Sequence, residues 1–236
     1  MNSVFHPSDS RGHANHGWLN TYHSFSFASW HNPERTHFGA LRVLNDDAVG
    51  RNAGFGTHPH ENMEIVSIPL SGSLEHRDSM GNATVIREGD IQIMSAGNGI
   101  MHSEKNHSSV EEVHFLQIWV FPNERNLSPS YGQITTSREE QMNKLQYVVS
   151  PDGREGLQIH QRAWICMGHL SSGWRDNYAM HDEGQGVYVM VLDGEAVVGG
   201  QTLLRRDAIG IWDTQNVQIE SRQNAHILAI EVPMQW

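Results

Sequence analysis

Two pairs of side chains, His58 with His60 and His102 with Glu104, are the residues of this sequence best suited to chemistry. The members of each pair are two positions apart, and residues two apart on a β-strand point to the same face. Two such strands facing each other across a small barrel would direct three imidazoles and one carboxylate at a common point. This donor set suits a divalent transition metal and leaves two octahedral positions open.

The residues around the pairs suit a site at the mouth of a barrel. Gly54 and Gly56 precede the first pair, and Gly97 and Gly99 precede the second, so each strand can begin at a tight turn. Pro59 removes one ladder donor, which is typical of an edge or irregular strand. A structural zinc site would be closed and would usually contain cysteine. The pattern therefore predicts a metal with open positions for dioxygen or substrate.

The alternative is that these side chains are ordinary surface or core histidines that bind no metal. A single histidine would favour that alternative, whereas two strand-spaced pairs, each preceded by glycines, favour the metal. The distribution agrees, because 12 of the 16 histidines lie at or before His114. We therefore place the metal chemistry in the first half of the chain.

Composition excludes several classes of protein. The formal net charge of −11 and the lack of a Lys/Arg-rich stretch argue against direct nucleic-acid binding. Cys166 is the only cysteine, so no intrachain disulfide can form. Residues 1–11 lack the apolar region of a secretory signal, and the longest apolar run, 187–192, is too short for a membrane span. We expect a cytoplasmic monomer with neither nucleic acid nor membrane as a partner.

Short apolar or alternating runs, separated by Gly, Asn, Asp and Pro, predict an all-β protein built of barrels or sandwiches. Turn residues at 78–82 and 193–194 predict hairpins. Only Ser137 to Leu145 has a helical pattern. The expected strands include residues 40–44, 64–70, 91–94 and 113–121, and then 163–167, 186–192 and 226–232.

The two halves share a faint pattern that indicates duplication. Residues 64–72 resemble residues 186–194 at a shift of 122 positions. At that shift Met180 and Asp182 occupy the places of His58 and His60, so the second copy lacks the ligands. We predict an N-terminal metal-binding domain over 1–134 and a C-terminal domain without metal ligands over 135–236. The alternative is that any two β-hairpins look this alike.

The same residues resemble a known family over essentially the whole chain. The segment from Gly56 to Gly72 resembles the first cupin motif, and 89–104 looks like the pirin version of the second. Residues 11–18 and 23–27 look like the pirin N-terminus. The chain is most similar to bacterial pirin-like proteins with quercetin dioxygenase activity. The resemblance implies a bicupin of two tandem cupin (double-stranded β-helix, jelly-roll) barrels, with metal in the first only.

The resemblance also implies which residues bind the metal. In most other cupins the glutamate at the position of Glu64 is a ligand, but in pirins the acid two residues after the second-motif histidine takes this role. The implied ligands are His58, His60, His102 and Glu104. Glu64 is then left as a strand residue or as one that orients a ligand, although ligation by it stays open.

Other histidines carry weaker expectations. Among the five N-terminal histidines, His23 is the first choice to line the pocket, because Phe25 and Phe27 follow at alternate positions. We interpret His76 as a solvated strand residue, and the direction of His114 stays open.

By this resemblance, the chain is a metal-dependent dioxygenase that cleaves the flavonol ring of quercetin-like substrates with O2 and releases CO. Glu104 would be both ligand and catalytic base. Fe(II) is the favoured cofactor, with Ni, Cu, Mn or Zn left open by the ligands. The alternative is a non-enzymatic metal- and redox-sensing protein that modulates a transcriptional or metabolic protein partner. Flavonol cleavage could also be incidental to another, diphenol-like substrate.

Overall fold

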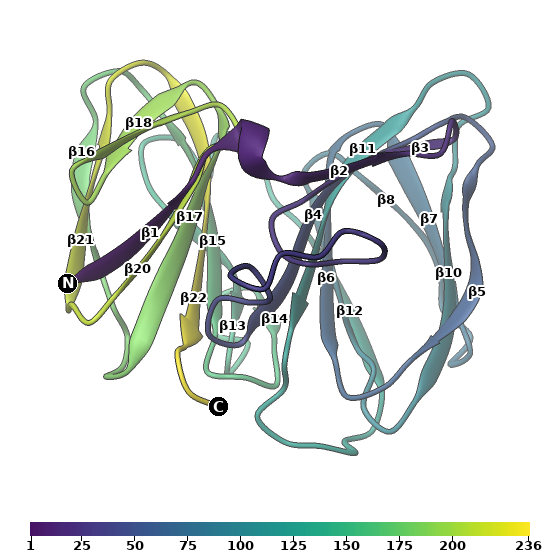
Figure 1. Cartoon of the computed structure of the whole chain (residues 1–236). Helices are drawn as coiled ribbons and strands as arrows, with labels where there is room; N and C mark the ends of the chain where they lie inside the picture. The colour runs from purple at the N-terminus through teal and green to yellow at the C-terminus, as the bar shows by residue number, and fades with distance from the viewer.

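The computed structural model describes all 236 residues, and short alternating segments form 22 β-strands in two barrels that lie side by side (Figure 1). The sole helix is a 3-10 turn, η1 (Ser8–Ser10). The first barrel consists of β2 (Gly12–Asn15), β3 (Leu19–His23), β4 (Leu41–Val49), β5 (Gly54–His60), β6 (Glu64–Ser71), β7 (Ser73–Asp78), β8 (Ala83–Arg87), β9 (Asp90–Ser95), β10 (Ile100–Asn106), β11 (Val113–Val120) and β12 (Ser130–Thr135). The second consists of β1 (Asn2–His6), β13 (Gln146–Ser150), β14 (Leu157–Gln158), β15 (Trp164–Leu170), β16 (Arg175–Ala179), β17 (Gln185–Asp193), β18 (Glu195–Val198), β19 (Gln201–Leu204), β20 (Ala208–Trp212), β21 (Asn216–Ser221) and β22 (Ala225–Pro233). The all-β prediction is confirmed.

Each barrel pairs a seven-stranded sheet with a four-stranded one. In the first barrel the orders are β12-β9-β6-β11-β4-β3-β2 and β5-β10-β7-β8. In the second they are β1-β20-β17-β22-β15-β13-β14 and β16-β21-β18-β19. Strands β4 to β11 therefore repeat, in the same spatial order, as β15 to β22. The tight turns at Gly72 and Gly194, both with positive φ, are equivalent in this repeat.

The pairing register corrects one detail of the sequence alignment between the halves. His58 pairs with His102 in the first barrel, and Tyr178 pairs with Val217 at the equivalent place in the second. Tyr178, and not Met180, is therefore the counterpart of His58. A constant shift of 122 fails here because the connection from β16 to β17 is longer than the one from β5 to β6.

The largest apolar core lies between the two barrels, where the seven-stranded sheets pack on each other. It contains 25 buried residues from both halves, including Leu41 and Ile118 from the first and Tyr188 and Ile230 from the second. A second core of 17 residues fills the second barrel. The first barrel holds only two small clusters, of six and four residues. Its interior therefore has room for polar side chains.

The strand that begins the chain does not stay in the first barrel. β1 pairs with β20, so the purple N-terminal strand lies among the green and yellow strands of the second barrel (Figure 1). His6 at its end donates to or accepts from the Tyr188 hydroxyl at 2.9 Å. The predicted domain boundary between residues 134 and 135 stays a prediction. It assigns β1 to the first domain, although β1 pairs with a strand of the second barrel.

The helix predicted over Ser137 to Leu145 is wrong. Ser137 and Glu140 form the reciprocal hydrogen bonds of a helix N-terminus, but only two i to i−3 turns follow. Met142 then bridges to His169, and Asn143 takes a positive φ of 54°. With no apolar face to bury, the segment passes between the barrels as turns.

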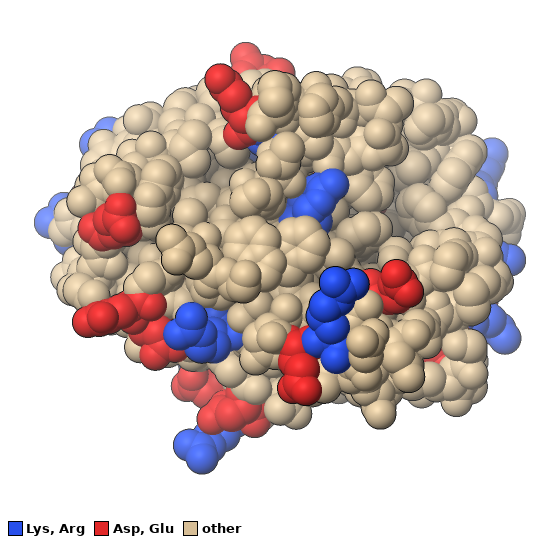
Figure 2. Space-filling view, turned by 60° about the horizontal axis from the view of Figure 1, so that its bottom comes forward, with Lys and Arg blue, Asp and Glu red and all other residues tan.

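The structure contains no helix with the length and apolarity that a membrane crossing requires. Acidic and basic side chains are interspersed on the face drawn in Figure 2, and no basic patch gathers there. Several charged side chains of the protein form ion pairs with each other, such as Arg162 with Asp182 and Arg175 with Glu220.

Candidate metal centre

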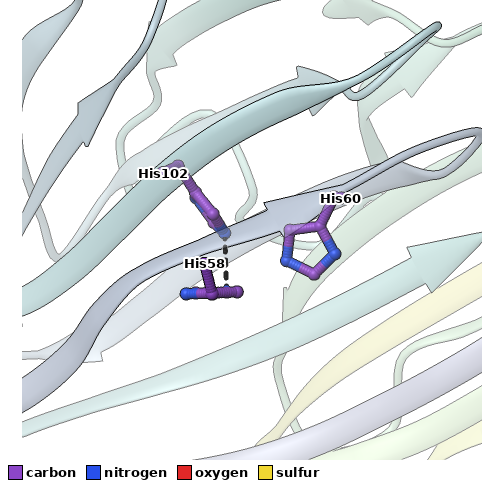
Figure 3. Close-up of side chains that lie close together, drawn as sticks. All are labelled: His58, His60 and His102. Carbon is purple, nitrogen blue, oxygen red and sulfur yellow. Dashed lines mark hydrogen bonds between the residues drawn. The ribbon is translucent and has the colours of Figure 1, made fainter.

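Three imidazoles converge from two neighbouring strands of the four-stranded sheet. His58 and His60 come from β5, and His102 lies opposite His58 on β10. Their ligand nitrogens all lie within 4.8 Å of one another, and the rings face a shared space (Figure 3). The Nε2 atoms of His58 and His102 are 3.1 Å apart. The i, i+2 spacing thus has the effect that strand geometry predicts.

Glu104 reaches the centre from the same strand as His102. The β5–β10 register shifts between these two residues, and both side chains are buried inside the barrel. A second group of ligand atoms within 4.8 Å consists of His76, His102 and Glu104. The four predicted site residues therefore fall into two overlapping groups that share His102.

Hydrogen bonds hold Glu104 in place from two other strands. Its Oε1 accepts from the Ser67 hydroxyl at 3.0 Å, and its Oε2 accepts from Nε2 of Gln117 at 2.6 Å. Burial raises the pKa of Glu104 to about 7, although both hydrogen bonds oppose that rise. This carboxyl can hold or release a proton near neutral pH.

The protonation and hydrogen bonding of the three histidines suit them to donate lone pairs to a metal. Burial, with added repulsion from neighbouring imidazoles, lowers the pKa of His60 to about 4 and that of His102 to about 3. Both rings are therefore neutral at neutral pH. Nδ1 of His58 lies 2.8 Å from the carbonyl of Gly56, which favours the tautomer that leaves Nε2 free as a ligand.

A cavity of about 500 Å³ opens beside these ligands. Its volume falls within the range of small-molecule sites. Its apolar lining residues include Leu19, Phe27, Phe55 and Trp119. Polar side chains from β3 and β4 line another part of the cavity, the polar wall. The polar wall includes Thr21, His23, Asn45 and Asp47, and His58, His60, Glu104 and Gln117 also line the space.

The other candidate residues from the sequence lie in three different places. Glu64 lies in neither ligand group: its Oε2 accepts from the Ser95 hydroxyl at 2.7 Å and from the backbone N–H of His160 at 3.1 Å. His23 lines the cavity, and His114 instead lies on the surface, 2.9 Å from a Glu112 oxygen.

His76 was misread as solvated, because its side chain is fully buried beside the centre. Nε2 lies 3.1 Å from Asp78 and Nδ1 lies 3.3 Å from Gln92, so both nitrogens have partners. One signal could have found it: His76 and Asp78 repeat the i, i+2 spacing on the strand beside β10. Asp47 and Gln117 were missed too; Gln117 lies between Leu116 and Ile118 of β11, whereas Asp47 follows two other polar residues in β4 and has no such signal.

Family models account for both barrels. A model described as Pirin matches residues 4–120, and one described as Quercetinase C-terminal cupin domain matches residues 147–232. The chain belongs to the pirin family. The resemblance and the bicupin fold predicted from the sequence are confirmed.

Relatives of this pirin cover nearly its whole length. A protein named quercetin 2,3-dioxygenase from Escherichia coli (strain K12) is 41% identical over 229 residues, with 96% of each chain covered. A pirin-like protein from Caulobacter vibrioides is 35% identical over 227 residues, with 95% of this chain and 97% of that one covered. A solved structure of the bacterial pirin YhhW from Escherichia coli, in complex with nickel(II), superposes with a TM-score of 0.93 at 38% identity, covering 98% and 99% of the two chains.

Proposed function

We propose that this pirin is a metal-dependent dioxygenase that opens the flavonol ring of quercetin-like substrates with O2 and releases CO. One observation carries the proposal: three imidazoles converge at the side of a cavity of about 500 Å³ whose lining includes aromatic side chains. The names of the Escherichia coli relatives, a quercetin 2,3-dioxygenase and a nickel(II) complex, support it. We propose His58, His60, His102 and Glu104 as the metal ligands.

The donor set fits a divalent transition metal. Imidazole suits Fe, Ni, Cu and Zn, and a carboxylate favours the harder metals among the candidates. Fe(II) is therefore the metal that we propose first, with nickel next because a relative binds it. When bound, such a metal acts as a Lewis acid that makes a coordinated hydroxyl more acidic.

The residues of the chain then have separate tasks. Phe27, Phe55 and Trp119 provide a surface on which a flat aromatic substrate can pack. Glu104 is the proposed base for the proton of the flavonol hydroxyl beside the ring carbonyl. Ser67 and Gln117 orient that carboxylate through their hydrogen bonds. Overall, one O2 is consumed and one CO is released for each flavonol cleaved.

The decisive experiment compares aerobic and anaerobic incubation of metal-loaded protein with quercetin. We expect the flavonol absorption band to disappear, with release of CO, only in the presence of oxygen. A folded variant with both His58→Ala and His102→Ala should lose turnover, whereas His114→Ala, a surface control, should keep it. Stoichiometric metal binding with no turnover for Fe, Ni, Cu, Mn or Zn would refute the enzyme. That outcome would favour the metal- and redox-sensing binding protein.

A further inference from the structure

The polar wall of the cavity contains a carboxyl group that the metal centre does not use. Asp47 lies on β4, where it pairs with Thr21 of β3 and with Phe115 of β11. The residue is only 5% exposed, yet it lines the same cavity as His58 and His60. It is therefore a buried acid that faces the space proposed for the substrate.

One oxygen of this carboxyl has spare hydrogen-bonding capacity. Asp47 Oδ1 is buried and has no hydrogen-bond partner in the protein. A buried polar atom without a partner in the chain costs stability, and beside a cavity a ligand group can supply that partner. Two other polar groups of the cavity already have partners: His23 Nδ1 lies 3.0 Å from Asn45 Oδ1, and Glu104 accepts two hydrogen bonds.

The protonation state of Asp47 suits contact with a hydroxyl. Burial raises the pKa of Asp47 to about 7, and the negative charges of Asp46 and Glu104 add to the rise, while the Thr21 hydroxyl opposes it. Whether neutral or ionised, the carboxyl retains an oxygen that accepts a hydrogen bond. A hydroxyl donor, rather than a cation, can therefore be the partner of Asp47.

The neighbouring acid shows that this arrangement is specific to one face of β4. Asp46 points away from the cavity and forms ion pairs with Arg11 at 3.2 Å and with Arg206 at 2.8 Å. The second barrel has Gly168 at the position equivalent to Asp47, in a barrel with an apolar interior. Of the two equivalent positions, only the one that lines the cavity beside the proposed ligands carries a carboxyl.

We propose that Asp47 accepts a hydrogen bond from a substrate hydroxyl other than the one beside the ring carbonyl, and so selects polyhydroxylated flavonols. The inference rests on the proposed function, which supplies the flavonol. A flavonol that carries no further hydroxyl leaves this carboxyl unpartnered. A site built to bind a hydroxyl discriminates strongly against the analogue that lacks it.

The test compares quercetin with 3-hydroxyflavone, the parent flavonol without other hydroxyl groups. Asp47→Leu should lower kcat/KM for quercetin, followed as oxygen uptake by the metal-loaded protein, by roughly 10- to 100-fold. The value for 3-hydroxyflavone should fall much less or rise. Asp47→Asn keeps a carbonyl acceptor and should recover part of the preference, and Asp46→Asn should leave the ratio of the two substrates unchanged.

The substrate ratio separates recognition from a purely structural role. An equal loss for both flavonols, or no loss for either, in variants with normal metal content overturns the inference. Anaerobic dissociation constants for the same two flavonols measure substrate recognition in the absence of the reaction. If the wild type binds quercetin without consuming oxygen, the dioxygenase proposal fails, and the ratio of dissociation constants still decides the role of Asp47. A wild type that binds neither flavonol overturns the inference directly.

Discussion

The two barrels share one strand plan but have opposite interiors. In the register of the repeat, the four proposed ligands of the first barrel and His76 correspond to apolar or aromatic residues in the second, all within its buried core. The replacements are His58 by Tyr178, His60 by Met180, His76 by Val198, His102 by Val217 and Glu104 by Ile219. The residues that surround Glu104 follow the same rule, since Val189 replaces Ser67, and Ala229 replaces Gln117.

This difference indicates a division of labour. Buried polar and titratable groups contribute less to stability than apolar side chains of similar size, and partly satisfied ones reduce it. The first barrel keeps such groups around a cavity and has only small apolar clusters. The second barrel and the 25-residue core between the barrels provide the apolar burial that offsets this cost. The proposed site and the larger apolar barrel interior therefore lie in different copies of one fold, and the core between the barrels is built from both.

The strongest test of this contrast is a matched pair of truncations at equivalent positions. His102→Ala should reduce bound metal from about one ion per chain to almost none, because His102 is the one residue that belongs to both groups of ligand atoms. Val217→Ala should leave the metal content unchanged. Metal analysis of both purified variants provides the measurement, and normal metal in the His102 variant would break the contrast.

A second truncation addresses stability in the barrel without ligands. Ile219 is fully buried at the position equivalent to Glu104. Ile219→Ala should lower the free energy of unfolding by about 2–5 kcal/mol, through lost burial and the cavity left behind. Chemical denaturation measures the change, and metal content should stay at the wild-type level. Loss of metal would mean that the two interiors are not independent.

A substitution beside the ligands should have a smaller effect. Gln117→Leu removes the 2.6 Å hydrogen bond that orients Glu104. Loss of a residue that orients a ligand typically weakens metal affinity about 10- to 100-fold. Competition with a chelator measures the affinity, and Gln218→Leu, on the exposed face of β21, is the control. Unchanged affinity in the Gln117 variant would show that Glu104 does not depend on this contact.

The core between the barrels should respond to acid. Burial near Phe25 and Tyr188, with a contribution from the charge of Arg35, lowers the pKa of His6 to about 4. The unfolded chain binds this proton near pH 6.5 and the folded chain does not, so stability falls as the pH drops from 6.5 towards 4. At pH 5 the loss from His6 is about 2 kcal/mol. Denaturation at pH 7 and pH 5 should show a smaller acid loss in His6→Gln, and an identical loss would contradict this origin.

Local spacing made part of the centre predictable. Two residues two apart on a strand must share a face, so the pairing of His58 with His60 and of His102 with Glu104 needed no knowledge of the register. The inward position of His76 depends on which face of β7 turns to β10, and that is decided by tertiary pairing. Asp47 was hidden for a similar reason, since only the fold shows that Asp46 faces outward and Asp47 inward. The helical pattern of residues 137–145 misled because a segment this short forms a stable helix only where it has an apolar face to bury.

The placement of β1 beside β20 has a consequence for how the protein is made. Residues 2–6 cannot find their partners until residues 208–212 have left the ribosome, because the pairing spans almost the whole chain. The opening segment must therefore wait, unpaired, while the first barrel is synthesised. Pairings this distant in sequence are slow to form and leave strand edges open in the meantime. The residues that are translated first are thus among the last to pair.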